Sequence, residues 1–126
     1  MYEIAVKRNF IAQHFLIGGD WGNENDSHSH HYQIEVILTG NELDQYGYLV
    51  DIVHLDNIMD KIVSRYRDRL LNDFDEFNGL NPSIENFARI LCEMIADQIK
   101  VSNVLKIKLQ IWENLIAWAS YTKDMV

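Results

Sequence analysis

Disulfides, membrane spans and an excess of positive charge are all missing from this sequence of 126 residues. Its one cysteine, Cys92, cannot form an intramolecular disulfide, and its place between Leu91 and Met94 predicts a buried, unreactive thiol. No apolar run approaches the roughly 18–20 residues that a membrane-spanning helix needs. The first residues, Met1–His14, alternate with charges and do not form the apolar core of a signal peptide. We therefore expect a cytoplasmic protein with no membrane partner.

Basic residues are outnumbered, with 11 Lys and Arg against 19 Asp and Glu and a net charge of −8. An acidic chain offers no electrostatic footprint for nucleic acid, so we expect no nucleic-acid partner. The hydrophobic share of 48% is enough for a sizeable core. The length predicts a single domain that spans residues 1–126.

Proline occurs once and glycine six times, so hydrophobic periodicity is the main guide to the elements. Residues 2–14 and 28–39 alternate apolar and polar side chains with a period of two, which predicts two long strands. The residues between them, 16–27, are rich in Gly, Asn and Asp and form a loop long enough to suggest a function.

Two helices and two further strands follow. The three-and-four spacing of apolar residues predicts helices from Leu49 to about Leu71 and from Ser83 to about Ile99. Strands are predicted at 104–112 and 115–121. The order β-β-α-α-β-β predicts an α+β fold with one four-stranded antiparallel sheet and both helices on one face. The two edges of that sheet must be paired or covered, so we expect an oligomer.

Three histidines are the strongest chemical signal. His28 and His30 are two residues apart in a strand, so their side chains share a face. His14 has the parity of the apolar face of the first strand, whereas His31 has the opposite parity to His30. Three neutral imidazoles around one open position form the ligand set of a catalytic zinc site. The alternative is that these are polar residues at strand ends.

Two glutamates also stand out in the sequence. Glu113 continues the core-facing parity of strand 104–112, and a buried carboxylate needs a partner such as adjacent N–H donors of a ligand. The alternative places it in water at a frayed strand end. Glu24, with Trp21, is one of the two large side chains of the loop 16–27, and from the residues alone it is a solvated loop acid or a functional one.

Several motifs resemble those of the 6-pyruvoyl-tetrahydropterin synthase and 6-carboxy-tetrahydropterin synthase family. Phe10–His14 and His28–Tyr32 resemble its F-x-A-x-H and H-G-H-x-Y segments. Gly47–Ile52 resembles G-x-V-x-D-F, and Leu71–Asp73 resembles L-N-D. Further on, Asn81-Pro82-Ser83-Ile84-Glu85-Asn86 resembles N-P-T-x-E-N, and Ile111-Trp112-Glu113 resembles the segment before the last strand. The likeness covers most of the chain in the right order.

The resemblance implies a T-fold subunit that assembles into a homohexamer around a barrel, with pockets between subunits. It implies a zinc ion (Zn²⁺) on His14, His28 and His30, and a small-molecule pterin substrate anchored by Glu113. In this family the metal holds the oxygens of the pterin side chain, a cysteine acts as the base, and an Asp-His pair assists a further proton transfer. The expected activity is that of a lyase or synthase on the side chain of a dihydropterin.

The chain departs from the family at the proton-transfer residues. The family's cysteine lies four residues before the first histidine of H-x-H, where this chain has Glu24. The region of the Asp-His pair reads Arg67-Asp68-Arg69, so Asp68 is only a second candidate there. A branch of the family uses a glutamate near the cysteine position to cleave the side chain of dihydroneopterin triphosphate. By resemblance Glu24 suits the role of that base, if burial raises its pKa.

Two other hypotheses assume the same fold but no catalytic activity. The first is a binding protein for a pterin or purine-like ligand that turns over no substrate. The second is a structural oligomer in which zinc only clamps the histidine hairpin. The first hypothesis predicts saturable pterin binding without product, and the second predicts no pterin binding and a loss of stability on chelation.

Overall fold

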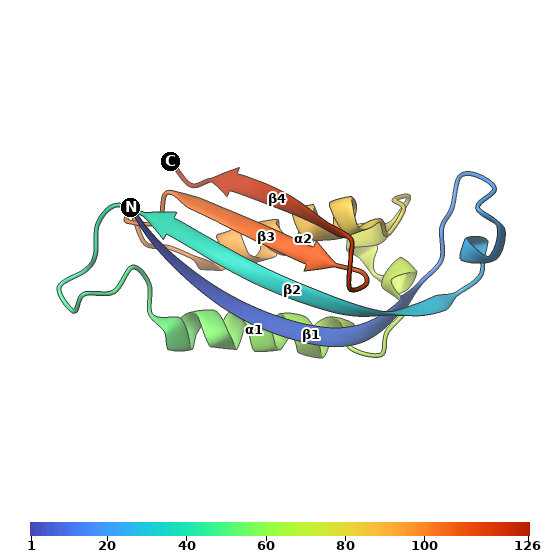
Figure 1. Ribbon diagram of the computed structural model, residues 1–126, viewed down its shortest axis with the longest axis horizontal. Helices are drawn as coiled ribbons and strands as arrows, with labels where there is room; N and C mark the ends of the chain where they lie inside the picture. Colours follow the sequence, from blue (N-terminus) through green and yellow to red (C-terminus); the bar gives the residue numbers. More distant parts are fainter.

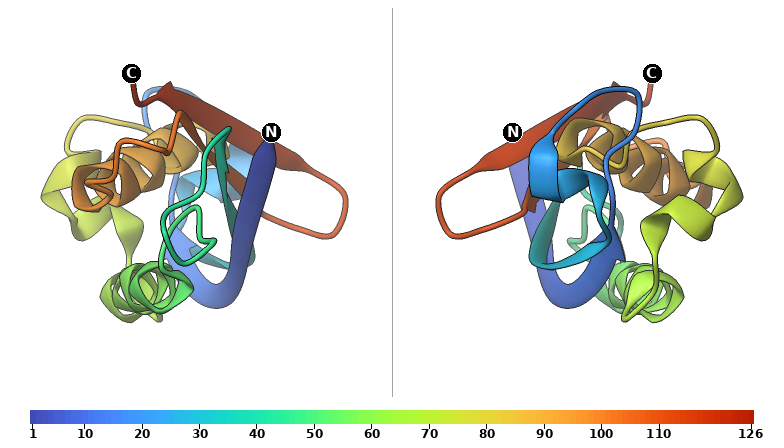
Figure 2. Two further views of the ribbon diagram at one scale, coloured as in Figure 1. Left: turned by 90° about the vertical axis from the view of Figure 1, so that its left-hand side faces the viewer. Right: turned by 90° about the vertical axis from the view of Figure 1, so that its right-hand side faces the viewer.

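One antiparallel sheet backed by two helices makes up the computed structural model, which describes residues 1–126 (Figure 1). Its strands lie in the order β1-β2-β3-β4 and have the bounds β1 (Tyr2–His14), β2 (His28–Gly40), β3 (Lys106–Trp112) and β4 (Trp118–Asp124). The helices are α1 (Ile52–Tyr66) and α2 (Ile84–Gln98), and both lie on the same side of the sheet (Figure 2). The predicted α+β fold with the order β-β-α-α-β-β is confirmed.

Strands β1 and β2 form a long hairpin whose ladder runs from the pair Tyr2 and Gly40 to the pair His14 and His28. Even-numbered residues of both strands point to the face that the helices cover, since side chains alternate along a strand. Tyr32, Ile34, Val36 and Leu38 of β2 are accordingly all fully buried. The same alternation carries His14, His28 and His30 onto the covered face at one end of the hairpin.

Aromatic rings fill the core between the sheet and the helices near that end. The ring of Phe87 from α2 contacts Phe10 and Tyr32 of the hairpin edge-on, at centroid separations of 6.1 and 5.3 Å. Cys92 is buried as predicted, its thiol donates to the carbonyl of Ile107, and burial raises its pKa to about 11. This thiol is therefore protonated at neutral pH and lies within the packed core.

Each helix begins at a side-chain cap. Asp51 accepts a hydrogen bond from the backbone N–H of Val53, and Ser83 accepts one from that of Asn86. Helix α1 is shorter than the predicted stretch 49–71, because the chain leaves the helix after Tyr66 in a turn where Asp68 has a positive φ. Two short 3₁₀ segments follow, η2 (Leu71–Asp73) and η3 (Asp75–Phe77). Ile52, the first residue of α1, is exposed, so the buried stripe of this helix begins at Leu55.

The last strand also differs from its prediction at 115–121, because β4 begins at Trp118. The side-chain oxygen of Asn114 accepts hydrogen bonds from the backbone N–H groups of Ile116 and Ala117. This Asn-initiated turn uses up the residues before Trp118 and leaves Leu115 and Ile116 projecting into solvent.

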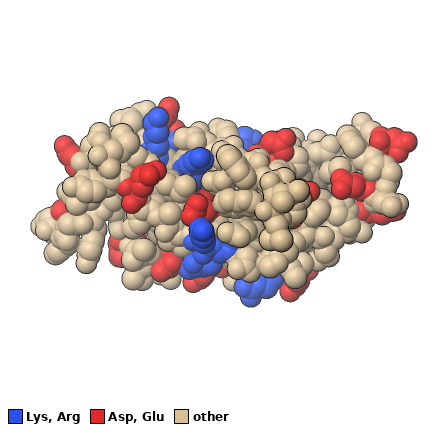
Figure 3. Space-filling model, viewed as in Figure 1, with Lys and Arg blue, Asp and Glu red and all other residues tan.

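Strands β1 and β4 are the edges of the sheet, and its second face is not covered by any helix (Figures 1 and 2). Basic and acidic side chains are interspersed in the middle of that face, while acidic ones predominate at the end that carries the loop 15–27 (Figure 3). No helix is long and apolar enough to cross a membrane.

Candidate functional site

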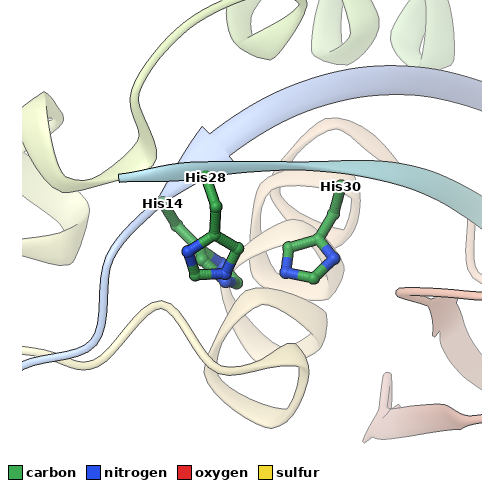
Figure 4. A group of neighbouring side chains, drawn as sticks. All are labelled: His14, His28 and His30. Atoms are coloured by element: carbon green, nitrogen blue, oxygen red, sulfur yellow. The ribbon is translucent and has the colours of Figure 1, made fainter. Parts of the chain in front are cut away.

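Three imidazoles converge at the end of the β1–β2 hairpin (Figure 4). His14 and His28 face each other across the ladder, and His30 follows two residues along β2. The ring centroids are 4.6 Å apart for His14 and His28, 4.6 Å for His14 and His30, and 4.8 Å for His28 and His30. One ring nitrogen of each lies within 4.8 Å of the others, so the predicted face-sharing of the three side chains is observed.

The rings of His28 and His30 direct unpaired nitrogen atoms into the protein. The Nδ1 of His28 lies 2.8 Å from the backbone carbonyl of Asp26. A carbonyl can only accept, so Nδ1 carries the proton and Nε2 keeps its lone pair. The Nε2 atoms of His28 and His30 are both buried and have no hydrogen-bond partner. Buried polar atoms are rarely left unpaired, and such lone pairs fit a bound metal ion.

His14 is the most deeply buried of the three, with 2% of its surface exposed. Its pKa is lowered to about 4, mainly by burial and also by the proximity of His30 and His28, while the carbonyl of Pro82 acts in the opposite direction. The ring is therefore neutral at pH 7, which is the form that binds metals. Its Nδ1 lies 2.8 Å from the hydroxyl of the buried Tyr32.

Two asparagine side chains hold the backbone that follows His14. Asn72 accepts from the N–H of Phe15 at 3.0 Å and donates to the carbonyl of the same residue at 3.0 Å. Asn81 accepts from the N–H of Ile17 at 2.6 Å. These asparagines were visible in the sequence only as letters of the L-N-D and N-P segments. Their positions show that these segments anchor the end of β1.

Glu113 lies next to the histidines, one residue beyond β3. Its carboxylate Oε1 is 3.7 Å from the Nε2 of His30, and its side chain is 25% exposed. The carboxylate is thus at the rim of the cluster, where it is both close to the rings and open to a ligand. His31 lies on the other face of the sheet, where its Nε2 is 3.2 Å from the side-chain oxygen of Asn9.

Glu24 lies on a short 3₁₀ segment, η1 (Gly22–Asn25), in the loop that connects β1 to β2. Its carbonyl accepts from the N–H of Leu16, and the neighbouring Asn25 donates to the carbonyls of Leu16 and Gly19. The backbone of the loop is therefore tied to the end of β1. The side chain of Glu24 is exposed and makes no hydrogen bond, so the single chain does not bring it into contact with the histidines.

Asp68 occupies an exposed turn beside the outer edge of β1. It has a positive φ of 59°, which is uncommon for a residue other than glycine. Its N–H donates to the carbonyl of Ile11, and the N–H of Gln13 donates to the carbonyl of Arg69. The turn is thus pinned to the strand that ends in His14, but the structure does not place Asp68 in the histidine cluster.

Comparisons of the sequence with known proteins identify a family and several relatives. The pattern that defines the family "6-pyruvoyl tetrahydropterin synthase" matches residues 3–124. Dihydroneopterin monophosphate aldolase from Pyrococcus furiosus is 29% identical over 111 residues, which cover 88% of this chain and 89% of that protein. The 6-carboxy-5,6,7,8-tetrahydropterin synthase of Bacillus subtilis is 30% identical over 78 residues, or 61% of this chain and 51% of that protein.

Solved structures share the fold over nearly the whole chain. The 6-pyruvoyl tetrahydropterin synthase of Caenorhabditis elegans superposes with a TM-score of 0.80 at 23% identity and 98% coverage of both chains. A catalytic-residue variant of the Plasmodium vivax enzyme, with alanine in place of glutamate, gives a TM-score of 0.79 at 16% identity and the same coverage. With its four-stranded sheet, its two helices and its family match over almost all residues, this chain belongs to the 6-pyruvoyl tetrahydropterin synthase family.

Proposed function

We propose that this protein is a zinc-dependent enzyme that cleaves the side chain of a dihydropterin. The observation that carries the proposal is the pair of buried, partnerless Nε2 atoms of His28 and His30 beside the neutral ring of His14. The family membership adds that pterins are the substrate class to test first.

The three histidines would hold the metal. Nitrogen donors at neutral pH suit Zn²⁺, and three protein ligands leave a position open, as in catalytic zinc sites. Zinc bound there supplies a Lewis acid that polarises oxygen atoms of the substrate side chain. The carbonyl of Asp26 orients the ring of His28, because hydrogen bonding of Nδ1 fixes which nitrogen faces inward.

Glu113 would bind the pterin ring. Its carboxylate lies at the rim of the cluster, 3.7 Å from His30, and is partly open to solvent. A carboxylate accepts two parallel hydrogen bonds from adjacent N–H donors, which the guanidine-like edge of a pterin provides. The ring would then lie against β3 while its side chain reaches the histidines.

Glu24 would act as the base. Removal of a proton from the hydroxyl on the second side-chain carbon lets the bond between the first and second carbons break. The second carbon leaves as an aldehyde, and the electron pair passes through the ring imine before the first carbon is protonated. The resulting product is a 6-hydroxymethyl-dihydropterin. A positioned carboxylate is a typical group for such proton transfers.

One comparison supports this reaction and another supports a glutamate as a catalytic group. The Pyrococcus relative is named an aldolase, which is a class of enzymes that break carbon–carbon bonds of this kind. The Plasmodium vivax structure is of a variant in which a catalytic glutamate was replaced. The only cysteine of this chain, Cys92, is buried in the core and protonated, so it does not suit the role of base. Asp68 is the second candidate, on an exposed turn.

Assembly into a homohexamer would complete the site. The outer edge of β4, and that of β1 before Ile11, carry unpaired backbone groups that favour pairing with further copies. Glu24 and Asp68 are exposed in the single chain. Neighbouring copies would cover these residues and exclude water from the side chain of the substrate.

The decisive experiment incubates zinc-loaded protein with 7,8-dihydroneopterin monophosphate or triphosphate and identifies the pterins by mass. We expect 6-hydroxymethyl-dihydropterin. The Glu24→Gln variant should lose turnover by about 10²- to 10⁴-fold, the usual contribution of a general base, with its zinc content unchanged. Glu42→Gln is the matched control, since Glu42 is an equally exposed loop acid whose side chain makes no hydrogen bond.

Unaltered turnover in Glu24→Gln would overturn the choice of base. Saturable pterin binding without any product would favour a ligand-binding protein instead of an enzyme. Absence of pterin binding together with a loss of stability on chelation would favour a purely structural metal site.

A further inference from the structure

A fully buried tyrosine contacts the innermost of the three histidines. Tyr32 has no exposed surface, and its hydroxyl oxygen lies 2.8 Å from the Nδ1 of His14. We propose that Tyr32 is a positioning residue for the metal: its hydroxyl accepts the Nδ1–H of His14 and thereby keeps the Nε2 lone pair of that ring free for coordination. The inference rests on the proposed metal site and adds a residue to it.

The ring of His28 shows what such a partner does. The carbonyl of Asp26 can only accept, so it fixes the proton of His28 on Nδ1 and leaves Nε2 free. The group at Nδ1 of His14 is instead the phenol of Tyr32, which can accept or donate. The tautomer of His14 therefore depends on where the hydroxyl hydrogen of Tyr32 points.

A metal on Nε2 would decide that orientation. A neutral imidazole that coordinates through one nitrogen carries its proton on the other, so Nδ1–H of His14 would donate and the hydroxyl of Tyr32 would accept. His14 would then match His28, whose Nδ1 is held by the carbonyl of Asp26.

The packing around Tyr32 holds its hydroxyl in place. Its ring lies 5.6 Å from that of Phe10 and 5.3 Å from that of Phe87, both measured between centroids. The phenol ring is thus packed between Phe10 of β1 and Phe87 of α2. Replacement by phenylalanine keeps these ring contacts and removes only the oxygen, so its main effect falls on the hydrogen bond with His14.

Tyr32→Phe tests the proposal by competition of the protein with a chelator for zinc. We expect zinc affinity to fall by about 10- to 100-fold, the usual effect of losing a group that orients a metal ligand. Tyr66→Phe is the matched control, because Tyr66 is also fully buried but its hydroxyl bonds Glu76 at 2.5 Å, away from the histidines. That variant should keep the zinc affinity of the unchanged protein.

A second measurement does not depend on any variant. Long-range ¹H–¹⁵N spectra of the zinc-loaded, unchanged protein report which nitrogen of each ring carries the proton. We expect Nδ1 of His14 to be protonated. An unprotonated Nδ1, or an affinity that is unchanged or tighter in Tyr32→Phe, would overturn the inference. Failure of the unchanged protein to bind zinc is a separate result, and it would overturn the metal part of the proposed function as well.

Discussion

The two ends of the β1–β2 hairpin share one continuous ladder but differ in what their side chains leave unsatisfied. At one end, His14 and His28 face each other and buried ring nitrogens lack partners. At the other end, Tyr2 pairs with Gly40 beside a cavity of about 580 Å³. That cavity is lined mainly by apolar residues, among them Leu43, Tyr48, Leu49, Ile52 and Val53.

The comparison shows that the volume of a cavity does not by itself identify the functional site. An apolar pocket with a few convergent polar groups is the usual default for a binding site. Here the apolar cavity has few polar groups, whereas the histidine end presents buried nitrogens that have no hydrogen-bond partner in the chain. Unpaired buried polar atoms carry a free-energy penalty, so their presence is the stronger sign of a site.

The two ends also differ in how their backbones are held. Asn103 donates to the carbonyls of Glu42 and Leu49 near the apolar cavity. Gly40 lies so close to the Asn103 backbone that a side chain there would overlap it. At the histidine end, Asn72 and Asn81 fix the segment after His14. Both ends are thus held by side-chain hydrogen bonds, but only the histidine end has a cluster of groups that could hold a metal ion.

The largest expected effect separates the two ends directly. His28→Ala removes one of three proposed ligands, and we expect zinc affinity to fall by about a hundredfold or more, since each ligand of a zinc site contributes about 3 kcal/mol. Tyr48→Ala enlarges the cavity at the opposite end and should leave zinc affinity unchanged. Chelator competition on both variants measures the difference. Equal affinities would contradict the assignment of the histidine end as the metal site.

The metal-free protein should lose stability in acid through His14. Its pKa of about 4 in the folded protein lies below the ordinary 6.5. Between these two pH values the unfolded chain therefore binds a proton that the folded chain does not bind. The contribution of His14 to the free energy of unfolding is fully present above pH 6.5 and is lost as the pH falls toward 4. The loss amounts to about 3 kcal/mol. Urea unfolding at pH 7 and pH 4.5, in the presence of chelator, measures the change. A stability that stays constant between pH 7 and pH 4.5 would show that His14 is not held neutral by its surroundings.

A smaller effect is expected for the rim of the site. Glu113→Gln keeps the shape of the side chain but removes its charge, so adjacent N–H donors of a pterin would lose a charge-assisted pair of hydrogen bonds. We expect pterin affinity to fall about tenfold, from the usual strength of such bonds. Fluorescence titration with dihydroneopterin measures it. An unchanged affinity would move the pterin anchor away from Glu113.

Much of this arrangement could be predicted from periodicity. The period of two placed His14 and Tyr32 on the covered face, because every side chain of a half-buried strand must choose one face. The hydrogen bond between these two residues could not be predicted, since it depends on the register of two strands. The start of strand β4 was also missed, because the turn at Asn114 is set by side-chain bonds that periodicity does not detect.

The candidate base marks the other limit of sequence reasoning. The spacing before His28 singled out Glu24 only through a family likeness, and the single chain leaves this side chain in solvent. A role that depends on neighbouring copies has no signature in the periodicity of one chain. The asparagines Asn72 and Asn81 were likewise motif letters until their bonds to the end of β1 were seen.

The smallest effect compares the two helix caps, which lie toward opposite ends of the hairpin. Asp51 caps α1 beside the apolar cavity, and Ser83 caps α2 next to Pro82 and Asn81, which contact the segment around His14. Loss of either cap should lower the free energy of unfolding by about 1 kcal/mol.

Only the loss of the Ser83 cap should change the affinity for zinc. Ser83→Ala loosens the turn that holds Asn81, so zinc affinity should fall by a few fold, while Asp51→Ala should leave it unchanged because its helix begins at the far end. Thermal unfolding and zinc titration on both variants measure the two quantities side by side. If both caps changed zinc affinity equally, the effect would come from global stability, and the local support of His14 by the start of α2 would have to be abandoned.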